Sequence, residues 1–126
     1  MKVSSKNEDA PAMSRGDGVV SYLLHSEDED NDGTNTDLTV TWVDVEPGES
    51  QVVHSHEPEQ VYVIVAGEGR MRVGDDEREV TVGDAVHIPS NTDHGIENTG
   101  EETLEYVSAA TPAIPHERVE EFYEDC

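Results

Sequence analysis

The stretch PGESQVVHSHEPEQVYVIVAGEG, residues 47–69, places two histidines and an amide within seven residues, just ahead of an apolar strand. His54 and His56 are two positions apart, and side chains at i and i+2 of an extended strand point to the same face. Both imidazoles can therefore reach one ion. Pro58 cannot donate a hydrogen bond to a neighbouring strand, so the chain is expected to bend there and to start a new strand at Gln60.

A pair of histidines separated by one residue is weak evidence for a metal site when it stands alone. His54 and His56 also suit a surface position, where they would neutralise acidic neighbours such as Glu59. A second stretch, GDAVHIPSNTDHGIEN at residues 83–98, favours a metal site. Its strand ends at a proline and a polar turn that delivers His94, and a third imidazole from an adjacent strand would complete the site.

These two stretches resemble the two motifs of the cupin superfamily, G-x5-H-x-H-x3,4-E-x6-G and G-x5-P-x-G-x2-H-x3-N. The residues that fall on the motif positions are, in order, Gly48, His54, His56, Gln60, Gly67, Gly83, Pro89, Asn91, His94 and Asn98. Gln60 stands at the glutamate position and Asn91 at the second glycine of the second motif. Asparagine tolerates the left-handed conformation that a turn glycine often supplies. The resemblance covers residues 38–110 and implies an all-β fold, a double-sheet jelly-roll β-barrel.

The resemblance also implies one divalent transition metal, held by His54, His56, Gln60 and His94. Gln60 replaces an anionic ligand by a neutral carbonyl, so the ion would keep more positive charge, polarise a substrate oxygen more strongly and bind less tightly. Glu59 is the rival ligand, but at a period of two it points to the opposite face of the strand. Nitrogen and oxygen donors suit Mn, Fe, Co, Ni, Cu or Zn, and the sequence does not choose among them.

Three imidazoles and an amide leave one or two coordination positions open, which is typical of catalytic metal sites. The resemblance then implies an enzyme that acts on a small molecule as a dioxygenase, isomerase, lyase or decarboxylase. Tyr62 or Tyr106 would donate or accept a proton if it faces inward. The alternatives are a non-catalytic cupin that binds a small ligand as a sensor or storage module, and a dimeric scaffold that keeps the metal for folding alone.

The composition limits the partners of the chain. Its 126 residues predict one domain. Thirty Asp and Glu against seven Lys and Arg give a net charge of −23, which argues against nucleic acid or an anionic membrane as a partner because both would be repelled. Disorder is disfavoured, since apolar strands persist between Leu38 and Val107. An acidic, lysine-poor surface is typical of proteins from extreme halophiles, and we adopt that interpretation.

Three segments are expected along the chain: a flexible N-terminal arm at residues 1–17, the barrel at 18–112, and a short C-terminal helix and tail at 113–126. The helix itself would span residues 115–124. Cys126 is the single cysteine and cannot form an internal disulfide. The N-terminus lacks the apolar core of a signal peptide, so we expect a cytoplasmic address.

Alternating apolar residues predict the strands of the barrel, which are Val19–Leu24, Leu38–Val45, Val61–Val65, Arg70–Val73, Arg78–Val82, Ala85–Ile88 and Leu104–Ala109. Trp42 is expected in the core rather than in a pocket. Val61, Val63 and Val65 lie opposite the Gln60 face, so this strand should be covered on both sides. A partner subunit is the natural second cover, and we expect a homodimer.

The acidic loop HSEDEDNDGTNT at residues 25–36 has the D-x-D-x-D-G spacing of a calcium loop. Its twelfth position is Thr39 rather than glutamate and its flanks read as strands, so a solvated loop is favoured over a cation site. His87 is interpreted as structural, with a supporting or proton-transfer role at the metal as the alternative. His25 and His116 are interpreted as surface residues.

Salt should stabilise this protein, because it screens repulsion among the carboxylates. Charges act over about 10 Å at 0.1 M ionic strength and over about 3 Å at 1 M. Between about 0.1 and 2 M KCl we expect Tm to rise by about 10 °C, which corresponds to about 2 kcal/mol for a domain of this size. Thermal unfolding followed by circular dichroism measures it, and NaCl should act like KCl. A flat or falling Tm would contradict the halophile interpretation.

Overall fold

The computed structural model describes residues 3–8, 10–15, 18–25 and 38–112. The acidic segment 26–36 and the predicted helix at 115–124 lie outside these ranges. The strands are β1 (Ala12–Ser14), β2 (Val19–His25), β3 (Thr39–Val45), β4 (Ser50–His54), β5 (Glu59–Ala66), β6 (Glu68–Val73), β7 (Asp76–Thr81), β8 (Ala85–Ile88), β9 (His94–Asn98) and β10 (Leu104–Thr111). In this part of the chain, no helix is long and apolar enough to cross a membrane.

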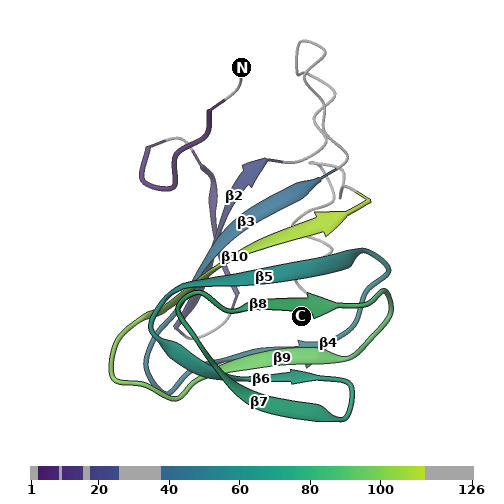
Figure 1. The fold of residues 1–126 in the computed structure, drawn as a ribbon. Helices are drawn as coiled ribbons and strands as arrows, with labels where there is room; N and C mark the ends of the chain where they lie inside the picture. The colour runs from purple at the N-terminus through teal and green to yellow at the C-terminus, as the bar shows by residue number, and fades with distance from the viewer. Residues whose placement is uncertain (1–2, 9, 16–17, 26–37, 113–126) are drawn as a thin grey trace.

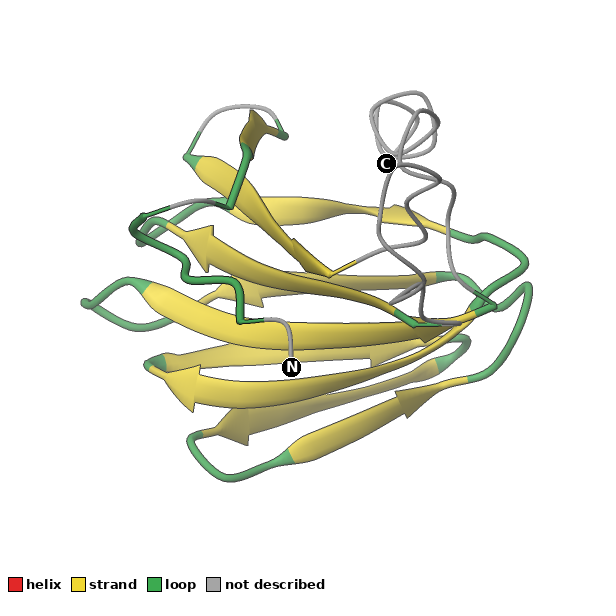
Figure 2. Ribbon diagram, turned by 90° about the horizontal axis from the view of Figure 1, so that it is seen from above, coloured by secondary structure: helices red, strands yellow, loops and turns green. Residues whose placement is uncertain are grey.

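Two antiparallel sheets form the molecule, as Figures 1 and 2 show. The larger sheet has the order β1-β2-β3-β10-β5-β8, and the smaller has the order β4-β9-β6-β7. Strands distant in sequence are therefore neighbours, and β10 pairs with both β3 and β5. This arrangement confirms the all-β, double-sheet jelly-roll fold predicted from the motifs.

The core lies between the sheets, because the strands alternate in burial. Along β3, for example, each buried side chain is followed by a half-buried one. The core residues are Val19, Val43, Val45, Tyr62, Ile64, Met71, Val80, Ile88, Ile96, Leu104 and Tyr106. Each such side chain contributes about 1.5–3 kcal/mol of burial free energy, so the chain needs both sheets to hold its shape.

Two motif turns depend on left-handed backbone. Gly67 has a φ of 79°, and a Cβ there would lie 2.8 Å from the carbonyl oxygen of Thr103. Asn91 has a φ of 56°, which confirms that asparagine serves where the cupin motif has glycine. The N–H of Asn91 donates to the carbonyl oxygen of His56 at 2.8 Å. This bond ties the second motif to the first.

Part of the N-terminal arm lies against the larger sheet. Residues 12–14 form β1, which pairs with β2 at the edge of the larger sheet. The ammonium of Lys6 lies 3.0 Å from a carboxylate oxygen of Asp44 and 3.0 Å from one of Glu105. These partly buried ion pairs hold the arm against the sheet, and sequence patterning does not predict them because the partners are remote in sequence.

Trp42 is expected in the core from the sequence, but it lies on the outer face of β3. The expectation is therefore wrong. Val43 and Val45 occupy the inner face of the same strand. The indole Nε1 donates to Glu105 at 3.0 Å, and the ammonium of Lys6 lies 5.2 Å from the centre of the Trp42 ring. The ring is half-buried under the arm, where a cation–π contact and a hydrogen bond suit an amphipathic aromatic residue.

The two faces of β5 differ in burial, although the strand is predicted to be covered on both sides. Tyr62 and Ile64 are buried between the sheets, whereas Val61, Val63 and Val65 are 37%, 39% and 36% exposed. The second cover that the sequence calls for is therefore not supplied by the described part of this chain. The valine face remains open on the outer surface of the larger sheet.

Candidate metal centre

Three histidines, one pair from the first motif and one from the second, meet between the sheets. The ring centres are 5.3 Å apart for His54 and His56, 4.3 Å for His54 and His94, and 4.9 Å for His56 and His94. One ligand nitrogen from each ring lies within 4.8 Å of the others. The structure therefore brings together the three histidines that the motifs single out.

Backbone carbonyls determine the tautomer of all three rings. Each Nδ1 lies within hydrogen-bond distance of a carbonyl oxygen two positions away; the pairs are His54 with Val52 (2.8 Å), His56 with Pro58 (3.0 Å) and His94 with Thr92 (2.9 Å). A carbonyl only accepts, so each Nδ1 carries the hydrogen and each Nε2 presents a lone pair. Metal-binding histidines are oriented in this way by such partners.

His54 reaches the interior because β4 contains an irregularity. Gln51 and His54 are both buried although they are three residues apart, and the pairing of β4 with β9 shifts register between them. Such a bulge turns the following side chain to the other face. On β9, a Cβ at Gly95 would lie 2.9 Å from a methyl group of Val53, so glycine is needed where the bulged strand approaches.

His56 occupies its place for a different reason from the one expected. Strand β4 ends at His54, so His56 lies in the following loop and the two do not share one strand face. The hydrogen bond from Asn91 to the His56 carbonyl and the contact of its Nδ1 with Pro58 position the ring instead. The two-residue spacing correctly predicted that His54 and His56 lie close together. It was wrong that both lie on one face of a single strand.

Gln60 and Glu59 point to opposite faces of β5, as the two-residue period predicts. The amide nitrogen of Gln60 donates to the hydroxyl of Ser108 at 2.9 Å, while its buried carbonyl oxygen has no hydrogen-bond partner among the described residues. Glu59 faces outward and lies 2.8 Å from Nε2 of His87. His87 is thus on the outer surface, away from the histidine cluster, and the supporting role considered for it at the metal is not supported.

Burial keeps the three imidazoles neutral. Desolvation lowers the pKa of His54 to about 4 and also lowers the pKa values of His56 and His94, against the opposing effect of their backbone hydrogen bonds. The Nε2 atom of His94 is buried and has no hydrogen-bond partner within the described ranges. A nitrogen lone pair buried away from water is costly unless it is satisfied, and a divalent transition metal fits these donors.

The two tyrosines proposed as proton carriers both face inward. Tyr62 and Tyr106 are 2% and 1% exposed. Their rings stack with centres 4.4 Å apart, and the Tyr62 ring lies edge-on to His94 at 6.0 Å. The hydroxyl of Tyr106 donates to Oε1 of Gln51 at 3.4 Å. Tyr62 is therefore adjacent to the histidine cluster, and Tyr106 packs against Tyr62.

Three neighbours of the cluster were missed in the sequence. Gln51 requires knowledge of the bulge before it can be assigned to the interior. The position of Ser108 could have been predicted, because it is two residues from Tyr106 on the predicted strand Leu104–Ala109 and so lies on the same face. Arg15 lies in the segment interpreted as a flexible arm, and its positive charge acts on His54 and His56.

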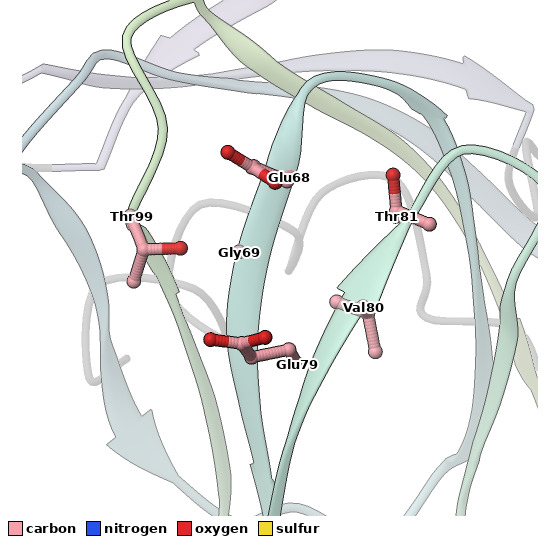
Figure 3. Close-up of a pocket in the computed structure, with 6 residues that line it drawn as sticks. All are labelled: Glu68, Gly69, Glu79, Val80, Thr81 and Thr99. Carbon is pink, nitrogen blue, oxygen red and sulfur yellow. The ribbon is translucent and has the colours of Figure 1, made fainter.

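A separate hollow of about 390 Å³ lies over β6 and β7. Figure 3 shows its lining, which consists of Glu68, Gly69, Glu79, Val80, Thr81 and Thr99. It shares no residue with the histidine cluster. Its charged side chains are the carboxylates of Glu68 and Glu79 only.

The neutral histidines predict that the metal-free protein is sensitive to acid. His54 binds a proton near pH 6.5 when unfolded and only near pH 4 when folded, so the unfolded state holds more protons between these values. This stabilising contribution is complete above about pH 6.5 and is lost as the pH falls toward 4. Urea unfolding with a chelator should show a smaller loss in His54→Gln, and His87→Gln should match the wild type. Parallel pH curves for wild type and His54→Gln would refute the assignment.

Comparison with known proteins agrees with the motifs. The family model described as Cupin domain matches residues 41–110. An uncharacterized protein of Methanocaldococcus jannaschii is 31% identical over 111 residues, which are 87% of this chain and 86% of that protein. An oxalate-binding protein of Thermotoga maritima is 36% identical over 63 residues, 49% of this chain and 52% of that protein. The crystal structure of an RmlC-like cupin from Shewanella frigidimarina has a TM-score of 0.70 and 25% identity, covering 90% of this chain and 96% of that chain. This chain belongs to the cupin family.

Proposed function

We propose that this chain is a metal-dependent cupin enzyme that acts on a small molecule. One divalent transition metal would be held by Nε2 of His54, His56 and His94 and by Oε1 of Gln60. The convergence of the three rings, each with Nδ1 directed to a carbonyl, carries the proposal. Buried imidazoles without such a purpose would leave lone pairs facing one another, at a cost in free energy.

The donor set decides what the ion supplies. All four donors are neutral, so a bound divalent ion would act as a Lewis acid with its charge uncompensated by the protein. Nitrogen and oxygen donors are compatible with Mn, Fe, Co, Ni, Cu or Zn. A cation that polarises a substrate oxygen can serve dioxygenase, isomerase or lyase reactions, and these are the reaction classes we propose.

The surrounding side chains supply the remaining functions. Tyr62 is buried beside His94 and is the group we assign to donate or accept a proton. Tyr106 stacks on Tyr62 and is hydrogen-bonded to Gln51, which holds both rings in place. The hydrogen bond that the amide nitrogen of Gln60 donates to the hydroxyl of Ser108 leaves the carbonyl oxygen of Gln60 for the ion.

A non-catalytic cupin that binds a small ligand is the second candidate, favoured by the oxalate-binding relative. The two candidates share the metal centre and differ in turnover. Metal-loaded protein that converts small carboxylates, catechols or diketones, and loses this activity in Tyr62→Phe while keeping its metal, is an enzyme. Protein that binds such molecules without product formation is a binding module.

The metal centre is tested by elemental analysis of protein purified in molar salt. Wild-type protein should contain a stoichiometric divalent metal, and His94→Ala should bind it at least about tenfold more weakly because a buried ligand is removed. His87→Ala is the matched control and should retain the metal, since that ring lies on the outer surface paired with Glu59. Metal-free wild type, or full retention by His94→Ala, would end the assignment.

We further propose that the valine face of β5 mediates a homodimer. Val61, Val63 and Val65 are exposed, and in register beside them lie Val107 and Ala109 of β10. This uncharged strip is a place where two chains of net charge −23 can approach each other without opposing carboxylates. Cupins often form oligomers, which agrees with this use of the face.

Light scattering in molar salt tests the homodimer. Wild-type protein should have the mass of two chains, and Val63→Glu should have the mass of one, because it would bury facing carboxylates at the interface. Val82→Glu adds the same charge at another exposed valine and should remain dimeric. A monomeric wild type, or a dimeric Val63→Glu, would show that this face is not the interface.

A further inference from the structure

The two sheets end in edge strands that do not pair with each other. Strand β8 is the last strand of the larger sheet, and β7 is the last strand of the smaller one. A hollow of about 310 Å³ is lined by residues of both edge strands and of β6. It shares no residue with the histidine cluster. The structure therefore contains a second concave site, at the open edge between the sheets.

Apolar side chains form much of the wall of this hollow. Met71 and Val80 are 2% and 5% exposed and belong to the core. Val73 and Val86 are partly buried and pack against the core. Pockets for small molecules are mostly apolar and typically measure about 300–1,000 Å³, so this hollow suits a molecule at the small end of the range. The thioether of Met71 favours an aromatic ring, because sulfur makes favourable contacts with ring edges.

Two of these valines connect the hollow to the proposed metal centre. Val73 of β6 is paired with His94 of β9, and Val86 of β8 is paired with Tyr62 of β5. Side chains directly opposite each other on neighbouring strands lie on one face, with Cβ atoms about 4.5–5.5 Å apart. Both His94 and Tyr62 are buried between the sheets. A molecule in the hollow would therefore be separated from each of them by a single side chain.

Arg78 is the one arginine or lysine that lines the hollow. It alternates with buried Val80 along β7 and is paired with buried Met71 of β6, so it lies on the face between the sheets although its side chain is exposed. The other lysines and arginines of the described ranges each form an ion pair or a hydrogen bond, and they are Lys6, Arg15, Arg70 and Arg72. Arg78 forms neither with any residue that the structure describes.

Two carboxylates line the same hollow, and neither forms an ion pair with Arg78. Asp84 accepts a hydrogen bond from the N–H of Thr81 at 2.8 Å. Asp76 is two residues from Arg78 and is paired with Val73 at the far end of β6. In a chain of net charge −23, an arginine that is near two carboxylates and paired with neither can bind the anionic group of a ligand.

We propose that this hollow binds a small aromatic carboxylate. The ring would lie against Met71, Val73 and Val86, and the carboxylate would accept hydrogen bonds from the guanidinium of Arg78, whose parallel N–H groups match carboxylate geometry. Binding itself does not involve a metal. That such a molecule is the substrate of the metal centre rests on the proposed function and deepens it by naming a substrate class.

Methyl NMR spectra of the protein in molar KCl and a chelator test the site, with benzoate as the probe. The methyl groups of Met71, Val73 and Val86 should show saturable shifts, whereas that of Val52, an exposed residue of β4 that does not line the hollow, should not move. Benzamide has the same ring without the charge, and acetate has the charge without the ring. Both should bind more weakly than benzoate.

Arg78→Gln tests the carboxylate contact. It should bind benzoate at least about fivefold more weakly, because a charge-assisted pair is lost, and it should bind benzamide like the wild type. Arg70→Gln is the matched control, since Arg70 is also exposed but is paired with Glu77 at 3.9 Å and does not line the hollow. It should bind benzoate like the wild type.

Val86→Phe tests the apolar part of the site. The larger side chain should fill the hollow and weaken the binding of benzoate and benzamide alike. Val82→Phe places the same ring at a valine that is 57% exposed and outside the hollow, and it should bind both probes like the wild type. If Val86→Phe does not fold, Arg78→Gln carries the comparison, because its side chain is exposed.

An absence of saturable shifts in the wild type, or equal benzoate binding by wild type and Arg78→Gln, would overturn the proposal. Arg78 would then only protect edge strand β7 from pairing with other chains, as inward-pointing charges on edge strands do. Elemental analysis separates this proposal from the proposed function. Protein that lacks metal but binds benzoate refutes the metal centre alone, and metal-loaded protein that does not bind benzoate refutes this site alone.

Discussion

The hydrogen bonds from three imidazole Nδ1 atoms to backbone carbonyls are the interaction on which the site depends. Each bond fixes both the tautomer and the direction of its ring, so the opposite nitrogen of each ring is left to face the others. These carbonyls belong to residues two positions from the histidines, in strand β4 and in loops next to strands. The packing of the sheets both excludes water from the three imidazoles and orients their Nε2 atoms. Burying these nitrogens costs free energy that a bound ligand can offset.

Charge is divided sharply between the surface and the interior of this protein. The chain carries a net charge of −23, yet the cluster consists of neutral imidazoles and a neutral amide. A negative exterior hinders the approach of anions in dilute buffer, and salt removes most of that hindrance because screening shortens the range of the field. High ionic strength therefore limits the influence of the acidic surface on charged molecules that approach the site.

Much of the fold follows from local patterning. Alternating side chains predicted β2, β3, β5 and β8 almost to the residue, because one face of each strand must be buried. The strand at Ala12–Ser14 and the outward position of Trp42 were not predictable in this way. Beside Trp42, Lys6 pairs with Asp44 and Glu105 from strands far along the chain, and local sequence does not encode which distant charges will meet.

The sequence by itself determined the donor types and their spacing, which are His54, His56 and His94 in two motifs together with Gln60. The two-residue period of the strand also predicted that Glu59, next to Gln60, points outward. Only the tertiary structure decided how they converge. The bulge before His54 and the loop that holds His56 arise from contacts between segments that are not neighbours in the chain. Residue identity sets which chemistry is available, whereas directions in space are set by packing, which no single segment contains.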